Sequence, residues 1–254
     1  SARYGNIYTV RQLHQLYERA EGAFHPADSV WTGKRGGYVD AFRPQISATD
    51  FPSHEAVEEA RITHYEAIRR MFREMDRFVF TLGLTEGWRS KLDGAVYPLA
   101  PGLAGGALDL DRYAFLNFSV TEMIVDLAAM IGNISSINPS AKIILTVSPV
   151  PLIAPFEPKN ALVATTYSKS ALRVVAEEIC KIYDHVDYFP SYEIITGNYN
   201  RGQYFADDLR EVLPEGVEHV MRIFMKHYTG AELSADSVLI SSRLSETLGR
   251  RRTF

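Results

Sequence analysis

A hydroxyl and a carboxylate follow directly on an apolar run in the first half of the chain. The run, Phe78 to Leu82, is short and has no polar alternation, which is typical of a strand buried on both faces of a parallel sheet. Gly83 ends the run, and Thr85 and Glu86 come next. Ligands bind beyond the carboxyl ends of parallel strands, so these two side chains are candidates for hydrogen bonding to a ligand and for proton transfer. The alternative is an ordinary loop in which Glu86 caps a turn.

Polar residues also follow the other apolar runs that we predict to be strands. Ser148 ends the run that begins at Lys142, and Ser191 and Glu193 follow the run that ends near Phe189. The carboxyl ends of parallel strands meet at one edge of the sheet, so these side chains join the candidates for a site there.

An acidic stretch, Asp207-Asp208-Leu209-Arg210-Glu211, lies just before the last predicted helix. Two interpretations stay open. Acidic side chains before a helix interact favourably with its dipole, which makes Asp207 above all a candidate cap. Asp208 and Glu211 are instead candidates for a site if they converge with Thr85 or Glu86, because carboxylates held close together repel and one pKa then rises toward that of a general base.

Several large classes of enzyme are excluded by the absence of their motifs. The sequence has no GxxxxGK[ST], GxGxxG, HExxH or GxSxG motif, and no Cys or His pairs at zinc spacing. We therefore expect no cofactor and no metal. His64 falls on or beside the buried face of a predicted helix and is interpreted as a core residue. Tyr167-Ser168-Lys169-Ser170 lacks the spacing that activates a serine and is interpreted as the start of a helix.

Hydrophobic periodicity predicts an α/β protein, a three-layer α/β/α sandwich with a flavodoxin-like parallel sheet and hairpin insertions. Helices are predicted near residues 10–20, 54–75, 121–137, 167–183 and 217–228. The parallel strands are predicted at 78–82, 142–148 and 185–189, with hairpins near 30–42 and 88–98. We expect one domain over residues 1–228, followed by a helix or tail over residues 229–254.

Composition excludes several partners. The 254 residues are 46% hydrophobic, carry a formal charge of −4 and include a single cysteine. This balance argues against a general nucleic-acid binder, which needs a basic face. No stretch reaches the length of a membrane span and no signal core begins the chain, so a cytoplasmic protein is expected. Oligomeric state is not predicted.

Four phrases in the chain resemble a known family. They are Phe-Thr-Leu-Gly-Leu-Thr-Glu at 80 to 86, Thr-Val-Ser-Pro-Val-Pro-Leu at 146 to 152, Tyr-Ser-Lys-Ser-Ala-Leu-Arg at 167 to 173 and Tyr-Phe-Pro-Ser-Tyr-Glu-Ile at 188 to 194. In this order they closely resemble the bacterial GSCFA-domain proteins, over roughly residues 3 to 228. That family is related to the SGNH/GDSL hydrolases, which implies a serine nucleophile after the first strand of a flavodoxin-like sheet.

The resemblance also assigns expected places for the site. The Gly83–Glu86 segment stands at the block that normally gives an oxyanion-hole asparagine, and the Asp208–Glu211 segment stands at the Asp-x-x-His block. Two departures matter. The Gly-Ser-Cys-Phe-Ala phrase with its serine would lie upstream of Ser1, and Glu211 occupies the place of the histidine. Serine hydrolysis needs a base for the hydroxyl proton and an acid that orients the base.

The expected function is that of an SGNH-like acyl-ester hydrolase or O-acyltransferase acting on a carbohydrate or other polar small molecule, in bacterial surface-polysaccharide metabolism. Asp208, Glu211 and Glu86 are the expected catalytic residues. The residues expected to bind substrate are Gly83, Thr85, Trp88 and Ser148. The alternative is a non-catalytic carbohydrate- or protein-binding module on the same scaffold, with Trp88, Tyr97 and Tyr192 as stacking surfaces.

Overall fold

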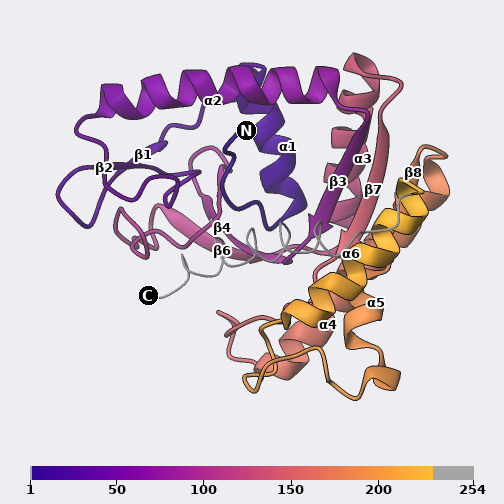
Figure 1. The fold of residues 1–254 in the computed structure, drawn as a ribbon. Coiled ribbons are helices and arrows are strands. Elements are labelled where there is room, and N and C mark those ends of the chain that lie inside the picture. The colour runs from indigo at the N-terminus through magenta and orange to yellow at the C-terminus, as the bar shows by residue number, and fades with distance from the viewer. Residues whose placement is uncertain (1, 231–254) are drawn as a thin grey trace. The chain divides into compact units, whose positions relative to one another are not determined.

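The structure is a computed structural model that describes residues 2–230. The chain divides into two compact units (Figure 1). Within the described residues, unit 1 contains residues 2–145 and 152–188, and unit 2 contains residues 146–151 and 189–230. Apart from Thr229 and Gly230, the predicted C-terminal helix or tail lies outside the described residues.

A three-stranded parallel sheet confirms the central prediction of an α/β fold. Its order is β3 (Arg77–Leu82), β7 (Lys142–Val147) and β8 (Val186–Tyr188). All three strands lie where the apolar runs predicted them. The prediction that β3 is buried on both faces is wrong, because Val79 is 48% exposed and Thr81 is also exposed. The central strand β7 is the one with a continuous buried run.

The predicted hairpins belong to two small antiparallel sheets. One pairs β1 (Val30–Thr32) with β2 (Tyr38–Asp40), and the other has the order β5 (Val96–Tyr97), β4 (Glu86–Ser90) and β6 (Tyr113–Asn117). Strand β6 was not predicted from the sequence. Aromatic side chains from both sheets share a buried cluster that includes Trp31, Trp88, Tyr97 and Tyr113. The hairpins therefore have a hydrophobic core of their own.

Four helices complete unit 1. They are α1 (Val10–Ala20), α2 (His54–Glu74), α3 (Val120–Ile137) and α4 (Ala161–Ile182). Each begins at a capping side chain that accepts a backbone N–H of the first turn: Thr9, Ser53, Ser119 and Asn160. Because Asn160 caps α4, this helix begins before Tyr167, and the interpretation of residues 167–170 as a helix start is wrong.

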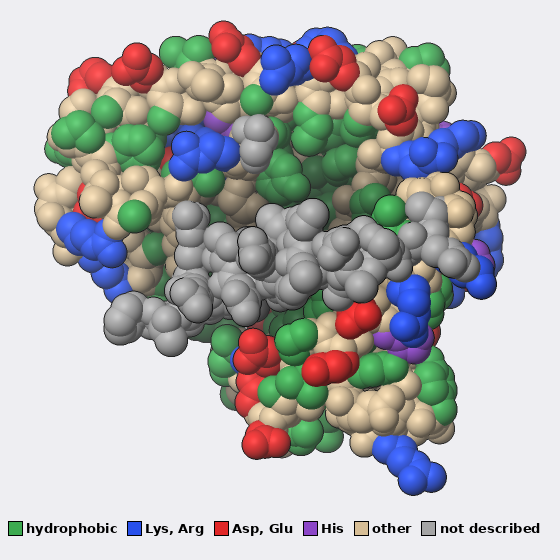
Figure 2. Space-filling model, viewed as in Figure 1, with side chains coloured by type: hydrophobic (Ala, Val, Ile, Leu, Met, Phe, Trp, Pro, Cys, Tyr) green, Lys and Arg blue, Asp and Glu red, His purple; other side chains and the backbone are tan. Residues whose placement is uncertain are grey.

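Helix α3 packs against α1, α2 and α4 and buries Met123, Leu127, Met130 and Ile131 among others. By length and composition alone it is also the one helix in residues 2–230 that could cross a membrane, which corrects the expectation that no stretch is long and apolar enough. Helix α2, in contrast, carries acidic and basic side chains intermixed on its outer face (Figure 2).

Unit 2 contains α5 (Ser191–Thr196), a 3-10 helix η1 (Asn198–Asn200) and α6 (Pro214–Tyr228). Helices α5 and α6 pack together, and the Phe189 ring contacts Phe224 with 5.1 Å between ring centroids. Ser191 Oγ lies 2.5 Å from Thr146 Oγ1 and donates to the Val147 carbonyl at 3.0 Å. The hydroxyl of Ser191 is thus used to join α5 to the residues that follow Leu145.

Candidate functional site

The Gly83–Glu86 segment lies where the sequence predicted it, at the carboxyl end of β3. The connection to the next strand is short, so Glu86 is already the first residue of β4 and pairs with Asn117 of β6. Thr85 is fully buried, and its carbonyl accepts the Phe118 N–H at 2.7 Å. A polar residue with no exposed surface keeps its place only where its hydrogen bonds are made inside the protein.

Helix α4 holds this segment from one side. Thr85 Oγ1 donates to Ser168 Oγ at 3.2 Å, and Lys169 Nζ donates to the Gly83 carbonyl at 2.8 Å. On the other side the Tyr8 carbonyl accepts the N–H groups of Gly83 at 3.2 Å and Leu84 at 2.9 Å. The backbone of the segment is therefore fixed by two parts of the chain that are distant in sequence.

Lys169 is the functional candidate that sequence reasoning missed. Its side chain is 1% exposed, and burial lowers its pKa from 10.5 to about 8 because the charged form loses its hydration. No carboxylate within residues 2–230 forms an ion pair with it. The signal was present in the sequence: Lys169 lies on the same helical stripe as Leu172, Ala176 and Ile179, which are buried.

Glu86 is half-buried at the start of β4. Burial raises its pKa above the ordinary value, the negative charge of Glu157 adds to this effect, and a hydrogen bond from the Phe156 N–H opposes it. Asn117 Nδ2 donates to Glu157 Oε2 at 3.1 Å, while Asn117 Oδ1 is buried without a partner in the described structure. Glu86 is thus paired in the sheet with a residue, Asn117, whose side-chain oxygen lacks a hydrogen-bond partner.

Aromatic rings adjoin this polar group. The Phe156 ring lies 4.7 Å from Trp88 and 4.8 Å from Phe115, measured between ring centroids. Phe156 is 56% exposed, whereas Trp88 is 8% exposed. The ring of Phe156, rather than that of Trp88, is accessible to a ligand.

The prediction that Trp88 and Tyr97 form a stacking surface for a ligand is wrong, because both side chains are buried. Tyr97 is 1% exposed and, like Trp88, belongs to the buried aromatic cluster of the hairpins. Alternation along β4 turns Trp88 into that core, and Tyr97 of β5 is paired directly with Trp88. Tyr192 is half-buried in unit 2.

The other expected site residues belong to unit 2. Ser148 is half-buried, and its hydroxyl accepts the Val150 N–H at 3.2 Å. Asp208 and Glu211 are exposed, and Asp208 Oδ1 accepts the N–H groups of Arg210 and Glu211, each at 2.9 Å. These two bonds hold the pKa of Asp208 below its ordinary value. The expected convergence of these residues with the Gly83–Glu86 segment stays a prediction.

The acidic stretch does not cap the last helix. Helix α6 begins at Pro214 after Leu213, and the acidic residue in its first turn is Glu215. Asp208 instead stabilises a turn of its own loop, in which Leu209 adopts a left-handed backbone with φ of 54°. The interpretation of Asp207 as a cap is therefore wrong.

Two histidines, His64 and His219, have structural partners. His64 is 5% exposed, and its Nδ1 lies 2.6 Å from the Ala2 carbonyl oxygen. Burial and the nearby Arg43 charge lower its pKa to about 4, so the interpretation as a core residue is confirmed. In unit 2, His219 Nδ1 lies 2.5 Å from the Tyr204 hydroxyl. Over the described range, no group of three or more His, Cys, Asp or Glu side chains is arranged to hold a metal ion.

Comparison with known proteins identifies one relationship. The model of the GSCFA family matches residues 1–224 of the chain. No curated protein and no solved structure matches it.

Proposed function

We propose that this chain, which belongs to the GSCFA family, carries out acyl-ester chemistry. The proposed activity is hydrolysis or transfer of an acyl group on a carbohydrate or other polar substrate, in the surface-polysaccharide metabolism of bacteria. The three-layer sandwich of SGNH type and the cytoplasmic location expected from the sequence are parts of the same proposal.

One observation carries this proposal: the Gly83–Glu86 segment is fixed from both sides at the carboxyl end of β3. Lys169 and Ser168 hold it from α4, and the Tyr8 carbonyl holds its backbone N–H groups. Groups that stabilise charge in a transition state are effective when they are positioned before the reaction begins. A segment held in this way fits the wall of a site that positions a substrate carbonyl.

Glu86 is the residue that we expect to act on the substrate. Its raised pKa and partial exposure fit a carboxyl group that exchanges a proton with a sugar hydroxyl or a water molecule. Asp208 has the opposite tendency, since its lowered pKa keeps it ionised. This suits an orienting acid rather than a base, and Glu211 keeps its proposed place as the base.

The reaction follows from the relationship to SGNH/GDSL hydrolases that the resemblance implies. A serine oxygen attacks the ester carbonyl, the alcohol leaves with a proton, and water or a second hydroxyl then takes the acyl group. The resemblance assigns that serine to the Gly-Ser-Cys-Phe-Ala phrase, which the sequence from Ser1 to Phe254 does not contain. Activity is therefore tested with the protein in its natural full length.

A binding module is the second candidate, and the exposed ring of Phe156 favours it. The Phe156 N–H donates to the Glu86 carboxylate, and the ring packs against Trp88 and Phe115. Asn117 of β6, which pairs with Glu86 of β4, donates to Glu157. An exposed aromatic face beside polar groups is the usual arrangement for holding a sugar ring.

Release of acetate distinguishes the two candidates. The full-length protein is incubated with p-nitrophenyl acetate and with a panel of acetylated sugars, alongside Glu86→Gln and the control Glu59→Gln, an exposed residue of α2. The proposal expects release that Glu86→Gln loses and Glu59→Gln keeps. Sugar binding without release, lost in Phe156→Ala, would favour the binding module. Equal rates for the two Gln variants would contradict the role of Glu86.

A further inference from the structure

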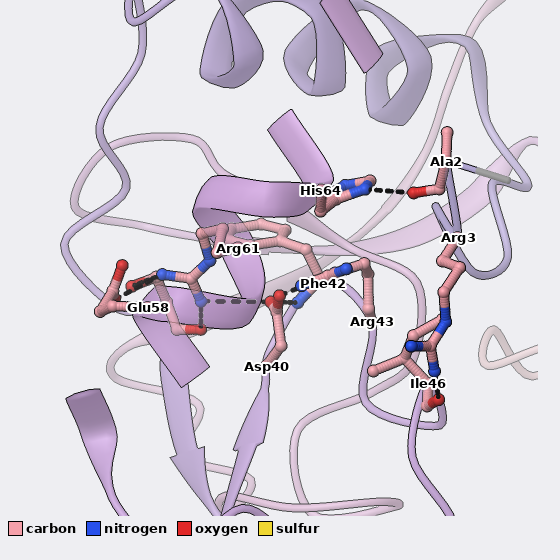
Figure 3. Close-up of polar contacts among 10 residues, drawn as sticks. Ala2, Arg3, Asp40, Phe42, Arg43, Ile46, Glu58, Arg61 and His64 are labelled. Carbon is pink, nitrogen blue, oxygen red and sulfur yellow. Dashed lines mark hydrogen bonds and ion pairs between the residues drawn. The ribbon is translucent and has the colours of Figure 1, made fainter. Parts of the chain in front are cut away.

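A second group of buried charges lies in unit 1 and shares no residue with the Gly83–Glu86 segment. At its centre Asp40, 1% exposed, accepts from Arg43 Nε at 2.9 Å and from Arg61 Nη2 at 3.2 Å (Figure 3). Arg61 Nη1 also donates to Glu58 Oε1 at 2.6 Å. Burial raises the pKa of Asp40, but the Arg61 and Arg43 charges together hold it below its ordinary value.

Arg19 is the member of this group that forms no ion pair within the described residues. The Tyr65 hydroxyl accepts a hydrogen bond from it, and the nearby Asp40 charge favours its charged form. The Arg19 side chain packs over the Phe42 ring at 3.9 Å and the whole residue is 7% exposed. No carboxylate of the described chain forms an ion pair with it, and its Nε and Nη1 atoms are buried without hydrogen-bond partners. Arginine keeps its charge in proteins, so a guanidinium buried in this way is costly unless something else compensates it.

A cavity adjoins this group between the end of α1, the segment that follows it, and α2. Its volume is about 370 Å³, and its lining includes Arg19, Ser29, Arg61, Tyr65 and Arg69. We call this space the arginine cavity. It is large enough for a small polar ion together with a modest organic group.

The charges around the arginine cavity do not balance. Three arginines of the lining (Arg19, Arg61 and Arg69) stand against the carboxylate of Glu58, which leaves two positive charges. Arg43 and Asp40 lie outside the lining and balance each other. Glu21, which also lines the cavity, is paired with Arg73 through both of its oxygens. A ligand with two negative charges would complete the balance.

We propose that the arginine cavity binds a phosphate dianion, either free or as a phosphate monoester. Guanidinium groups present several N–H donors in a planar fork that matches the oxygens of phosphate, and the hydroxyls of Ser29 and Tyr65 add further donors to the same lining. A carboxylate would bring a single charge, which leaves the group unbalanced.

Two neighbouring arginines of α2 give a matched pair of variants. Arg69→Gln removes a charge from the lining, whereas Arg70→Gln removes the same charge from an exposed position outside it. Arg19→Met removes the Arg19 guanidinium while keeping most of its apolar stem. The intact chain and each variant are titrated with inorganic phosphate by calorimetry, and thermal unfolding is followed with phosphate or with chloride at equal ionic strength.

The proposal expects saturable phosphate binding that raises the unfolding temperature beyond the effect of chloride. Arg69→Gln and Arg19→Met should weaken this binding by at least about tenfold, a loss of one or two charge-assisted hydrogen bonds, whereas Arg70→Gln should leave it unchanged. If Arg19→Met fails to fold, the Arg69 and Arg70 pair still decides the result.

Further ligands identify the source of the dianion. Tighter binding of glucose 6-phosphate than of inorganic phosphate would assign the cavity to a phosphate monoester, and the reverse order would assign it to free phosphate. The proposal is overturned if phosphate acts no differently from chloride, if acetate binds as tightly as phosphate, or if Arg69→Gln and Arg70→Gln bind phosphate equally.

Discussion

Two polar segments of this chain, Gly83–Glu86 and Asp208–Glu211, are positioned by different means. The first is held by residues that are remote in sequence, namely Tyr8, Ser168 and Lys169. The second is held mainly within its own loop, because the Asp208 carboxylate accepts the N–H groups of Arg210 and Glu211, and one long-range bond joins Arg210 Nη2 to the Pro151 carbonyl at 3.4 Å. The first depends on the tertiary fold, and the second is mainly an exposed local turn.

This difference predicts how each segment responds to substitution. Groups fixed by buried, long-range contacts are sensitive to the loss of any one of them, since the partner that is left behind stays buried. A solvent-exposed turn can replace a lost hydrogen bond with water. The free energies of unfolding of variants in both segments therefore test whether buried long-range contacts or local hydrogen bonds hold each segment in place.

The largest expected effect concerns the stem of Lys169. Lys169→Ala and Lys169→Met both remove the ammonium group and its bond to the Gly83 carbonyl, but only alanine also empties the buried space of the stem. Lys169→Ala should therefore be less stable than Lys169→Met by between about 2 and 5 kcal/mol, as for other large-to-small core changes. Urea unfolding measures this difference. Equal stabilities would mean that the stem is not packed.

The pH dependence of stability tests the charge of Lys169. Its pKa is about 8 in the folded chain against 10.5 ordinarily. Between these values the unfolded chain holds a proton that the folded chain has released, so the free energy of unfolding rises with pH. Below pH 8 both states hold the proton and Lys169 adds no slope.

Relative to Lys169→Met, the unsubstituted protein should gain up to about 3 kcal/mol of stability between roughly pH 8 and pH 10.5. Urea unfolding of both proteins across this range measures the gain, and the comparison removes the contribution of the tyrosines. Parallel curves for the two proteins would contradict the buried position of the ammonium group.

A smaller effect is expected for the hydroxyl pair that joins the segment to α4. Thr85→Val keeps the shape of the side chain but removes the donor to Ser168, so it should cost about 1 kcal/mol. A double-mutant cycle with Ser168→Ala should give a coupling energy of similar size. Purely additive effects would show that the two hydroxyls do not interact.

The smallest effect is expected at the exposed segment. Asp208→Asn keeps an acceptor oxygen for the Arg210 and Glu211 N–H groups, so its unfolding midpoint in urea should shift less than that of Thr85→Val. A larger shift than that of Thr85→Val would mean that the Asp208 carboxylate contributes more to the fold than its exposure implies.

Much of the secondary structure could be predicted from periodicity and capping residues. The apolar runs of β7 and β8 and the Ser53 cap of α2 are local signals, and each led to the right element. Strand β6 was missed because its place depends on pairing with β4, which is not visible in its own residues. The exposed side chains of β3 were missed for a similar reason, since strand order in the sheet decides burial.

The candidate site could be predicted only in part. Gly83, Thr85 and Glu86 were found because a strand end is a local feature. Lys169 was missed because a lysine is usually solvated, and only the position of α4 against Gly83 makes it a buried donor. Phe156 was missed because its contact with Trp88 joins residues far apart in the chain.

The central claim is that the Gly83–Glu86 segment is held in place by several buried tertiary contacts, whereas the Asp208–Glu211 segment is held mainly by bonds within its own loop. Amide hydrogen exchange, followed by NMR, tests it most directly. The N–H groups of Gly83 and Leu84 donate to the Tyr8 carbonyl, and those of Arg210 and Glu211 donate to an exposed carboxylate. The account predicts exchange at least about a hundredfold slower for the first pair, since its opening requires breaking tertiary contacts. Equal protection of the two pairs would contradict it.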